Sequence, residues 1–173
     1  MAIFELPIST LHGEFVAHYT EKGLAGLDFP KAVGIAIPIP RSSTRAGSST
    51  QIPPPILQWH RDTGNALKKI LAGTGPGKLP PLDWTGKTEF QQRVWTAMLK
   101  IPPGRTQSYG ELAAAIGKPK AVRAVGGACG ANPIPVLVPC HRVLAANGKI
   151  GGFSSGLNWK YRLLEREGIV FKS

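Results

Sequence analysis

The chain has 173 residues and a formal net charge of +11, with 21 Lys and Arg against 10 Asp and Glu. This length can bury a hydrophobic core and form one large domain or two small ones. The two cysteines, Cys129 and Cys140, exclude a disulfide framework, and the positive charge makes an anionic partner the first to consider.

The beginning of the chain predicts no export signal. The segment MAIFELPIST has Glu5 and Pro7 where a signal peptide has a positive start and an uninterrupted apolar stretch. No apolar stretch approaches the roughly 20 residues that a transmembrane helix needs. We therefore expect a soluble, cytoplasmic protein, or a nuclear one in a eukaryote, with no membrane partner.

The first 84 residues predict a small sheet accompanied by a helix. Residues 12–30 contain two strand-like runs joined near Glu21, which is typical of a hairpin. Residues 38–55 are rich in Pro, Ser and Thr and predict a surface loop, whereas residues 61–73 predict a short helix. The Gly- and Pro-rich stretch 73–86 indicates a domain boundary.

The second half predicts three helices in a basic environment. Residues 86–173 carry thirteen Lys and Arg against four Asp and Glu, a net charge of +9. Apolar residues recur at helical spacing in 88–101, and shorter helical segments follow at 108–117 and 121–130. A capping box, Ser or Thr three residues before Glu or Gln, begins each of the first two helices. The last two, joined by a tight turn in a basic segment, suggest a helix-turn-helix.

An apolar segment then leads to Cys140. Residues 131–140, ANPIPVLVPC, place three prolines around a short apolar run, which predicts a buried extended segment entered through an Asn-Pro turn. A final helix is predicted over residues 157–168. Its apolar face would be formed by Leu157, Tyr161 and Leu164.

Cys140 has the sequence surroundings of a reactive thiol. A free cysteine is ordinarily a small buried hydrophobic residue. Here His141 follows directly, and a nearby imidazole commonly converts a thiol into the nucleophilic thiolate. Arg142 adds a positive charge that favours the same ionised form. These neighbours favour a nucleophile over a packed core residue.

Glu167 lies in the last turn of the final predicted helix, where a carboxylate meets the negative end of the helix dipole. Two interpretations stay open. The residue is either a solvated acid paired with a neighbouring Lys or Arg, or a carboxylate that orients His141 in a nucleophile, base and orienter arrangement.

The sequence contains no metal or cofactor signature. Ten residues separate Cys129 from Cys140 and the four histidines are scattered, which does not match zinc-ligand spacing. The GKT at 86–88 lacks the upstream glycine of a phosphate loop. We expect no metal and no cofactor, and we expect Cys129 to be a packed thiol rather than a second nucleophile.

Two stretches closely resemble one protein family. Residues 90–133 and 132–168, the latter with PCHRV at 139–143, are similar to the 6-O-alkylguanine-DNA alkyltransferases, also called methylated-DNA–protein-cysteine methyltransferases. The resemblance implies an α+β fold. A small N-terminal sheet-plus-helix domain of ribonuclease H-like type, 1–84, would precede a mostly helical, winged-helix-like DNA-binding domain, 85–173, that carries the helix-turn-helix and the active-site cysteine.

The resemblance implies direct reversal of DNA damage. Cys140 would take an alkyl group, such as methyl, from the O6 position of guanine in duplex DNA, in one in-line displacement that restores the guanine and spends the protein. His141 would relay the cysteine proton through a water, and Glu167 would orient His141. Asn132 would brace the turn before the active-site segment, and Tyr109 would hydrogen-bond the base and help neutralise the leaving group.

The same resemblance implies that the damaged base is swung out of the helix, because its oxygen is inaccessible inside duplex DNA. Arg123 would fill the space left behind, from a helix lying in the minor groove. The expected DNA contacts are Ala121, Arg123, Gly126 and Gly127. The expected pocket residues are Tyr109, Pro135, Val143, Phe153, Ser154 and Ser155. The expected partner is double-stranded DNA containing alkylated guanine, bound by a monomer.

Three alternatives remain from the sequence. An alkyltransferase-like protein would bind the lesion without chemistry, but such proteins lack the reactive cysteine that Cys140 provides. A cysteine hydrolase would use Cys140, His141 and Glu167 but would need neither a helix-turn-helix nor a basic half. A transcription regulator would not need a positioned thiol.

Overall fold

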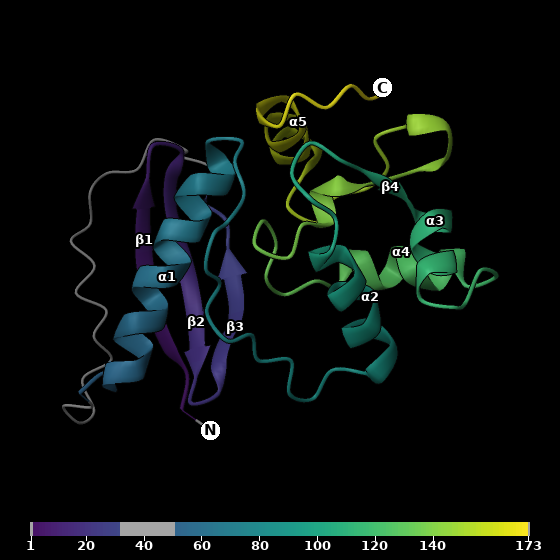
Figure 1. Ribbon diagram of the computed structural model, residues 1–173. Helices are drawn as coiled ribbons and strands as arrows, with labels where there is room; N and C mark the ends of the chain where they lie inside the picture. The colour runs from purple at the N-terminus through teal and green to yellow at the C-terminus, as the bar shows by residue number, and fades with distance from the viewer. Residues whose placement is uncertain (1, 32–50, 173) are drawn as a thin grey trace.

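The computed structural model describes residues 2–31 and 51–172, which form a mixed α/β structure with a small sheet in its N-terminal half and mostly helices in its C-terminal half (Figure 1). The N-terminal elements are β1 (Phe4–Thr10), β2 (Gly13–Thr20), β3 (Gly23–Asp28) and α1 (Pro54–Leu71). The C-terminal elements are α2 (Glu89–Leu99), β4 (Gln107–Ser108), α3 (Tyr109–Ala115), α4 (Val122–Gly130), η1 (Cys140–Arg142), β5 (Val143–Leu144), η2 (Ala146–Gly148) and α5 (Leu157–Arg166). None of the described helices is long and apolar enough to cross a bilayer.

The N-terminal sheet is antiparallel, in the order β1-β2-β3. The hairpin predicted over residues 12–30 is confirmed as β2 and β3, which pair from Thr20 and Gly23 outward. β1 has no counterpart among the predicted elements, because Pro7 lies inside it and interrupts the strand pattern. β1 tolerates this proline because it is an edge strand, with β2 as its only neighbour in the described sheet.

Helix α1 lies across one face of this sheet (Figure 1). It begins at Pro54, earlier than the predicted residue 61, and its two initial prolines occupy the first turn, where proline is tolerated. Ile56, Leu67 and Ile70 are buried between helix and sheet. Most of the surface loop predicted at 38–55 falls outside the described residues.

The C-terminal helices confirm the helical predictions from the sequence. Both predicted capping boxes are present, at Thr88 of α2 and Ser108 of α3. Trp95 of α2 is fully buried, and its indole N–H donates to the carbonyl of Ala128 in α4 at 2.8 Å. This contact and the packing of α3 on α4 fix α4 against the rest of the half.

The segment leading to Cys140 is buried as predicted but is not extended. Residues 133–138 form turns, Val136 has a φ of 74°, and Cys140 begins the short 3₁₀ helix η1. Prolines lack the N–H groups that a strand needs, so the segment cannot pair along its length. The Asn132 side chain closes the turn instead, accepting from Ile134 N–H at 3.0 Å and donating to Val138 C=O at 2.8 Å.

The predicted apolar face of α5 is only partly correct. Leu164 is fully buried, but Leu157 is 41% exposed. The helix instead buries Leu163 and the charged Lys160, whose side chain is completely inaccessible. The apolar pattern alone could not reveal this rotation, because a lysine counts as a polar, outward-facing residue.

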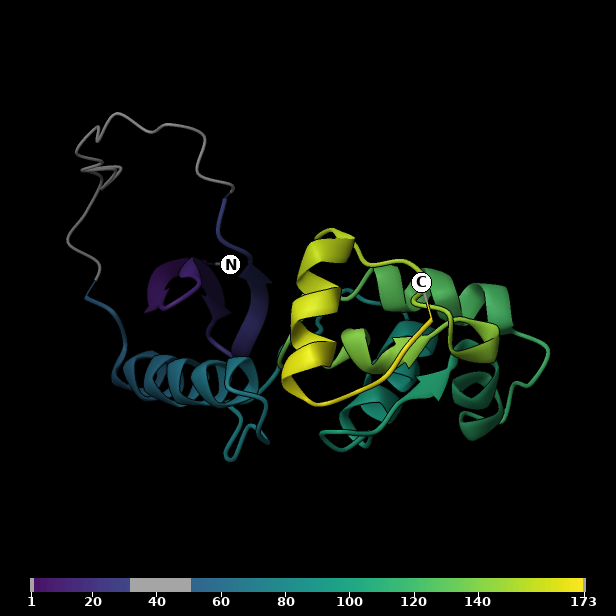
Figure 2. The same ribbon diagram turned by 90° about the horizontal axis from the view of Figure 1, so that it is seen from above.

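The two halves are joined by backbone hydrogen bonds beside β3 and by α5, which lies along their boundary (Figure 2). Leu24 N–H donates to Pro81 C=O at 2.8 Å, and Asp83 N–H donates back to Leu24 C=O at 2.8 Å. Leu27 N–H donates to Pro133 C=O at 2.9 Å. The N-terminal sheet therefore holds the turn that precedes the cysteine.

We expect Gly73→Ala to destabilise the protein at the junction of α1 and α5. Gly73 has a φ of 85°, and a Cβ there would lie 2.1 Å from the carbonyl oxygen of Arg166. Gly86 provides a matched control, with a φ of 79° and no atom within 4 Å of its added Cβ. Gly86→Ala should cost about 1 to 3 kcal/mol from backbone strain alone, and Gly73→Ala should cost more in urea unfolding. Equal losses would contradict a tight junction.

Candidate active site

Cys140 lines a small cavity between α3, α4 and the loop that precedes α5. The cavity has a volume of about 120 Å³ and is lined by Tyr109, Gly126, Cys129, Gly130, Cys140, Gly152, Phe153 and Ser154. It is well below the roughly 300 Å³ at which pockets for small molecules and cofactors begin. A larger cavity of about 330 Å³, beside His12 and Trp159, is not lined by Cys140. The nucleophile candidate thus faces a small cavity rather than a large cofactor pocket.

The Cys140 thiol is almost completely buried, with 6% of the residue exposed. Burial raises the pKa of this thiol, while a hydrogen bond with the Asn132 side chain and the charge of Lys160 act to lower it. The resting protein therefore holds a protonated thiol whose ionisation requires a proton acceptor and a compensating charge.

His141 carries a ring nitrogen that can serve as such a proton acceptor. Its side chain is fully buried, and Nε2 lies 3.0 Å from Oε1 of Glu167, whose side chain is also fully buried. Burial lowers the pKa of His141, against the raising effect of Glu167, so the ring is neutral. Donation from Nε2 leaves Nδ1 as the unprotonated nitrogen. Nδ1 is buried without a hydrogen-bond partner among the described residues.

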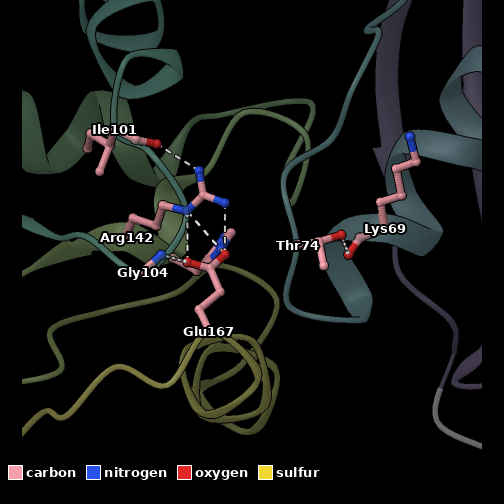
Figure 3. Close-up of polar contacts among 7 residues, drawn as sticks. Lys69, Thr74, Ile101, Gly104, Arg142 and Glu167 are labelled. Carbon is pink, nitrogen blue, oxygen red and sulfur yellow. Dashed lines mark hydrogen bonds and ion pairs between the residues drawn. The ribbon is translucent and has the colours of Figure 1, made fainter.

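Glu167 is the centre of a buried polar cluster. Its burial decides between a solvated surface acid and a carboxylate that binds His141. Figure 3 shows Arg142 pointing from η1 toward Glu167, to which it donates through Nε and Nη2, the latter at 2.8 Å. The backbone N–H of Gly104 donates to the same carboxylate at 3.1 Å. Burial acts to raise the pKa of Glu167, but the bonds from His141 and Arg142 outweigh it and lower it to about 2. A solvated surface acid is therefore excluded.

The expectation that Arg142 favours the thiolate is wrong. The guanidinium binds Glu167 and donates to the carbonyl of Ile101 at 2.7 Å (Figure 3). Its positive charge is therefore neutralised by the Glu167 carboxylate rather than by a thiolate. Lys160 supplies the cation near the thiol instead. Its ammonium donates to the carbonyls of Val143 at 2.7 Å and Gly152 at 3.1 Å. Burial lowers the pKa of Lys160 to about 8, against the raising effect of the thiolates of Cys140 and Cys129.

Sequence reasoning missed Lys160, and no local motif distinguishes it from the exposed Arg162 and Arg166 on the same helix. Its position is set by α5 and by two loop carbonyls that come from elsewhere in the chain. By binding Val143 and Gly152 together, the ammonium fixes one wall of the cavity relative to the cysteine segment.

The other predicted pocket residues divide into two groups. Tyr109, Phe153 and Ser154 line the cavity with Cys140. Burial raises the pKa of the Tyr109 phenol, and the charge of Cys129 adds to the increase, so the hydroxyl keeps its proton and can donate it. Pro135, Val143 and Ser155 do not line the cavity as it stands. Pro135 and Val143 are buried, and the Val143 carbonyl accepts from Lys160.

The predicted DNA contacts lie together on α4 and at its start. Arg123 and Gly127 are exposed, and Ala121 and Gly126 are partly exposed. A Cβ added at Gly126 or Gly127 would meet no protein atom within 4 Å. Packing inside the protein therefore does not explain these glycines, although each weakens the helix by about 1 kcal/mol relative to alanine. They leave the backbone of α4 uncovered by side chains at these two positions.

Among the described residues, no group of three or more His, Cys, Asp and Glu side chains could hold a metal ion. Cys129 is a packed thiol with 6% exposure, and its Sγ donates to Sδ of Met98 at 3.7 Å. Burial and the charge of Cys140 raise the pKa of Cys129 to about 12. This thiol is therefore far less nucleophilic than an ionised cysteine would be.

Comparisons with known proteins agree with this geometry. Residues 89–169 match the family model described as 6-O-methylguanine DNA methyltransferase, DNA binding domain. The methylated-DNA–protein-cysteine methyltransferase of Mycobacterium bovis is 59% identical over 120 residues, 66% of this chain and 72% of that protein. The enzyme of the same name from Methanosarcina acetivorans is 41% identical over 170 residues, 96% of this chain and 97% of that protein. The chain belongs to the methylated-DNA–protein-cysteine methyltransferase family.

Solved structures of this methyltransferase family extend the match to the whole fold. The crystal structure of the Mycobacterium tuberculosis O6-methylguanine methyltransferase aligns with a TM-score of 0.66 at 34% identity, covering 96% of this chain and 93% of that one. The structure of Mycobacterium tuberculosis OGT in complex with DNA aligns with a TM-score of 0.66 at 35% identity, covering 95% and 92%. The small antiparallel sheet and the helices thus follow the arrangement of the methyltransferase family.

Proposed function

We propose that this protein repairs DNA directly, by a single transfer of an alkyl group from O6 of guanine in duplex DNA to the sulfur of Cys140. The observation that carries the proposal is a nucleophilic thiol on a small cavity, backed by a buried histidine and carboxylate and adjoining a glycine-rich helix face. A lesion-binding protein without chemistry is not favoured, because it would lack the positioned thiol. A hydrolase would not explain why α4 has two glycines, Gly126 and Gly127, that no packing inside the protein requires.

The reaction uses the site's groups in sequence. The Cys140 thiol gives its proton to Nδ1 of His141 through a bridging water, and Glu167 holds the resulting imidazolium through Nε2. The thiolate attacks the alkyl carbon, forming an S–C bond as the C–O6 bond breaks. The electron pair leaves with the guanine, whose charge the Tyr109 hydroxyl helps to neutralise through a hydrogen bond. The guanine ring then gains one proton from solvent, and His141 returns to its neutral form by releasing one. Because the product is a thioether, each molecule reacts once.

Access to the guanine requires that the nucleotide leave the base stack. We propose that α3 and α4 act as a helix-turn-helix, with α4 in the minor groove and Arg123 occupying the vacated space. Gly126 and Gly127 allow the sugar-phosphate backbone to lie against the helix, with Ala121 at its start. The net charge of +9 on residues 86–173 supplies affinity that does not depend on base sequence.

The remaining features of the proposal concern architecture. The chain would consist of a ribonuclease H-like domain, 1–84, and a winged-helix-like DNA-binding domain, 85–173, with the boundary in the Gly- and Pro-rich linker. The protein would act as a monomer on double-stranded DNA containing alkylated guanine, in the cytoplasm or, in a eukaryote, the nucleus. Pro135, Val143 and Ser155 would contact the base once the segments around the cavity adjust to it.

Mass spectrometry after incubation with duplex DNA containing O6-methylguanine tests this function. We expect one methyl group on the peptide containing Cys140, in a yield that never exceeds one per protein molecule. An unmodified Cys140 peptide together with tight binding of the lesion would favour the non-catalytic alternative.

Arg123→Ala should separate base extrusion from chemistry. The side chain is exposed on α4 and touches no part of the cavity, so its loss leaves the thiol intact. Transfer from duplex DNA should slow at least about tenfold, the kinetic equivalent of 1.4 kcal/mol, whereas reaction with a free O6-benzylguanine base should be unchanged. Equal slowing of both reactions would contradict the assigned role.

Gly127→Ala should make the protein more stable and a poorer DNA binder. The added methyl meets no protein atom and improves the helix, so the free energy of unfolding should rise by about 0.5 to 1 kcal/mol. The same methyl would stand between α4 and the DNA backbone. Urea unfolding and fluorescence anisotropy with duplex DNA measure the two effects, and unchanged DNA affinity would count against α4 as the contact surface.

A further inference from the structure

An aromatic wall of the Cys140 cavity is supported by a residue of the N-terminal half. Phe153 lines the cavity with Cys140. Its ring meets the ring of Phe29 edge to face, with the centroids 6.0 Å apart and an interplanar angle of 84°. Phe29 directly follows β3, the strand of the sheet nearest the C-terminal half (Figure 1). One side of the cavity therefore depends on a side chain from the other half of the chain.

Phe29 is itself held in place by two further rings. The ring centroid of Trp159, on α5, lies 4.9 Å from that of Phe29, and the centroid of Phe15, on β2, lies 5.4 Å from it. The next residue, Pro30, packs closely on the β1–β2 turn, because a Cβ added at Gly13 would lie 2.8 Å from the Pro30 Cβ. In such close packing, Phe29 has little freedom to move away from the cavity wall.

The backbone around Phe153 gives its ring few constraints, because it is rich in glycine. Gly151 and Gly156 have positive φ angles of 68° and 92°, and a Cβ added at Gly152 would meet no atom within 4 Å. Hydrogen bonds of this segment, such as that from Gly156 N–H to Phe153 C=O at 3.1 Å, hold the main chain but not the ring. The orientation of the ring therefore depends on its contact with Phe29.

Aromatic rings are scarce in the lining of the cavity. Of the residues that form it, Tyr109 and Phe153 are the aromatic ones, and three others, Gly126, Gly130 and Gly152, offer a ligand no side chain. Nucleobases bind to proteins largely by stacking on aromatic faces. The binding of a base in this cavity therefore depends on how these two rings are oriented.

We propose that Phe29 is a positioning residue for alkyl transfer, whose edge contact holds the Phe153 ring in the orientation that receives the base. Phe29 does not line the cavity and takes no part in the hydrogen bond between His141 and Glu167. It therefore acts on the binding of the base and not on the ionisation of the thiol. This inference rests on the proposed function, and it gives the N-terminal half a part in base recognition.

Single-turnover kinetics of Phe29→Leu with the free O6-benzylguanine base test this role without DNA binding. The half-saturating concentration should rise about two- to tenfold, the range expected for one lost aromatic edge contact, while the limiting rate stays unchanged. The pH profile of Cys140 labelling by iodoacetamide should also stay unchanged. Phe29→Tyr keeps the ring and should restore wild-type values. Phe171→Leu removes a ring from a separate aromatic pair, with Tyr161, and is the control.

A double-mutant cycle with Phe153→Leu separates positioning from a general loss of packing. Once the Phe153 ring is gone, Phe29→Leu should have no further effect on the half-saturating concentration, because the contact it removes no longer exists. Urea unfolding establishes that each variant is folded, and Phe29→Met replaces Phe29→Leu should the latter not fold. Additive effects, or a change no larger than that of Phe171→Leu, would overturn the inference alone. No transfer by the wild type would overturn the proposed function and this inference with it.

Discussion

Cys140→Ala should abolish methyl transfer while preserving affinity for DNA. The substitution removes one sulfur atom from the cavity wall and leaves the exposed face of α4 unchanged. Cys129 cannot replace the nucleophile, because burial raises the pKa of its thiol and, unlike Cys140, it has no histidine next to it in the chain to take the proton. The methylated peptide should disappear completely, whereas the anisotropy titration with lesion-containing duplex should match that of the wild type.

Cys129→Ala provides the matched control for this experiment, because it removes a sulfur atom from the same cavity. Transfer to Cys140 should persist in this variant. If methyl appeared on Cys129 in the Cys140→Ala protein, the assignment of a single nucleophile would be overturned. A loss of DNA affinity in Cys140→Ala would instead show that the cysteine segment shapes α4, the helix proposed to contact DNA.

Glu167→Gln should destabilise the protein strongly and slow alkyl transfer. The carboxylate is buried against the guanidinium of Arg142 and the ring of His141. Removing its charge leaves the arginine buried without a counter-ion, which typically costs about 3 to 5 kcal/mol. Transfer should slow as well, because His141 loses the acceptor that fixes its tautomer. Glu165→Gln, on the exposed side of α5, is the control and should change neither property.

The pH dependence of stability identifies the Glu167 contribution. Its pKa is about 2 in the folded protein and near 4.5 when unfolded, so the unfolded chain takes up the proton more readily. The stabilisation is complete above pH 4.5 and is lost as the pH falls from 4.5 toward 2. Urea unfolding should therefore show a gap between wild type and Glu167→Gln that narrows across this range. A gap independent of pH would mean that packing, not charge, is lost.

Local patterns in the sequence predict most of the helices and the β2–β3 hairpin. Both capping boxes, at Thr88 and Ser108, depend on residues within one helical turn, and the structure contains both. Local patterns do not predict β1, because Pro7 interrupts the alternation of apolar and polar residues along it. The strand depends on its pairing with β2. The prolines after Asn132 indicated burial, but the turn they form depends on side-chain hydrogen bonds that no periodicity records.

The chemistry of the site was predicted less evenly. The adjacency of Cys140 and His141 is visible in the sequence, and the family resemblance singles out Glu167. Arg142 was assigned to the thiol because it is nearby in sequence, yet its side chain binds Glu167. Lys160 was missed because its partners, the carbonyls of Val143 and Gly152, come from other segments. Charge placement in a buried site depends on tertiary contacts that lie outside any short motif.

The hydrogen bond from the Leu27 N–H to the Pro133 carbonyl links the N-terminal sheet to the segment that leads to the reactive cysteine. It anchors an otherwise irregular stretch seven residues before the reactive sulfur. Movement of the sheet would therefore change the angle at which that sulfur meets its target carbon. Changes in β3 that weaken this bond but leave the buried Phe15, Tyr19 and Leu24 in place would then slow repair without unfolding the protein. Sorting variants by their distance from the cysteine would overlook them.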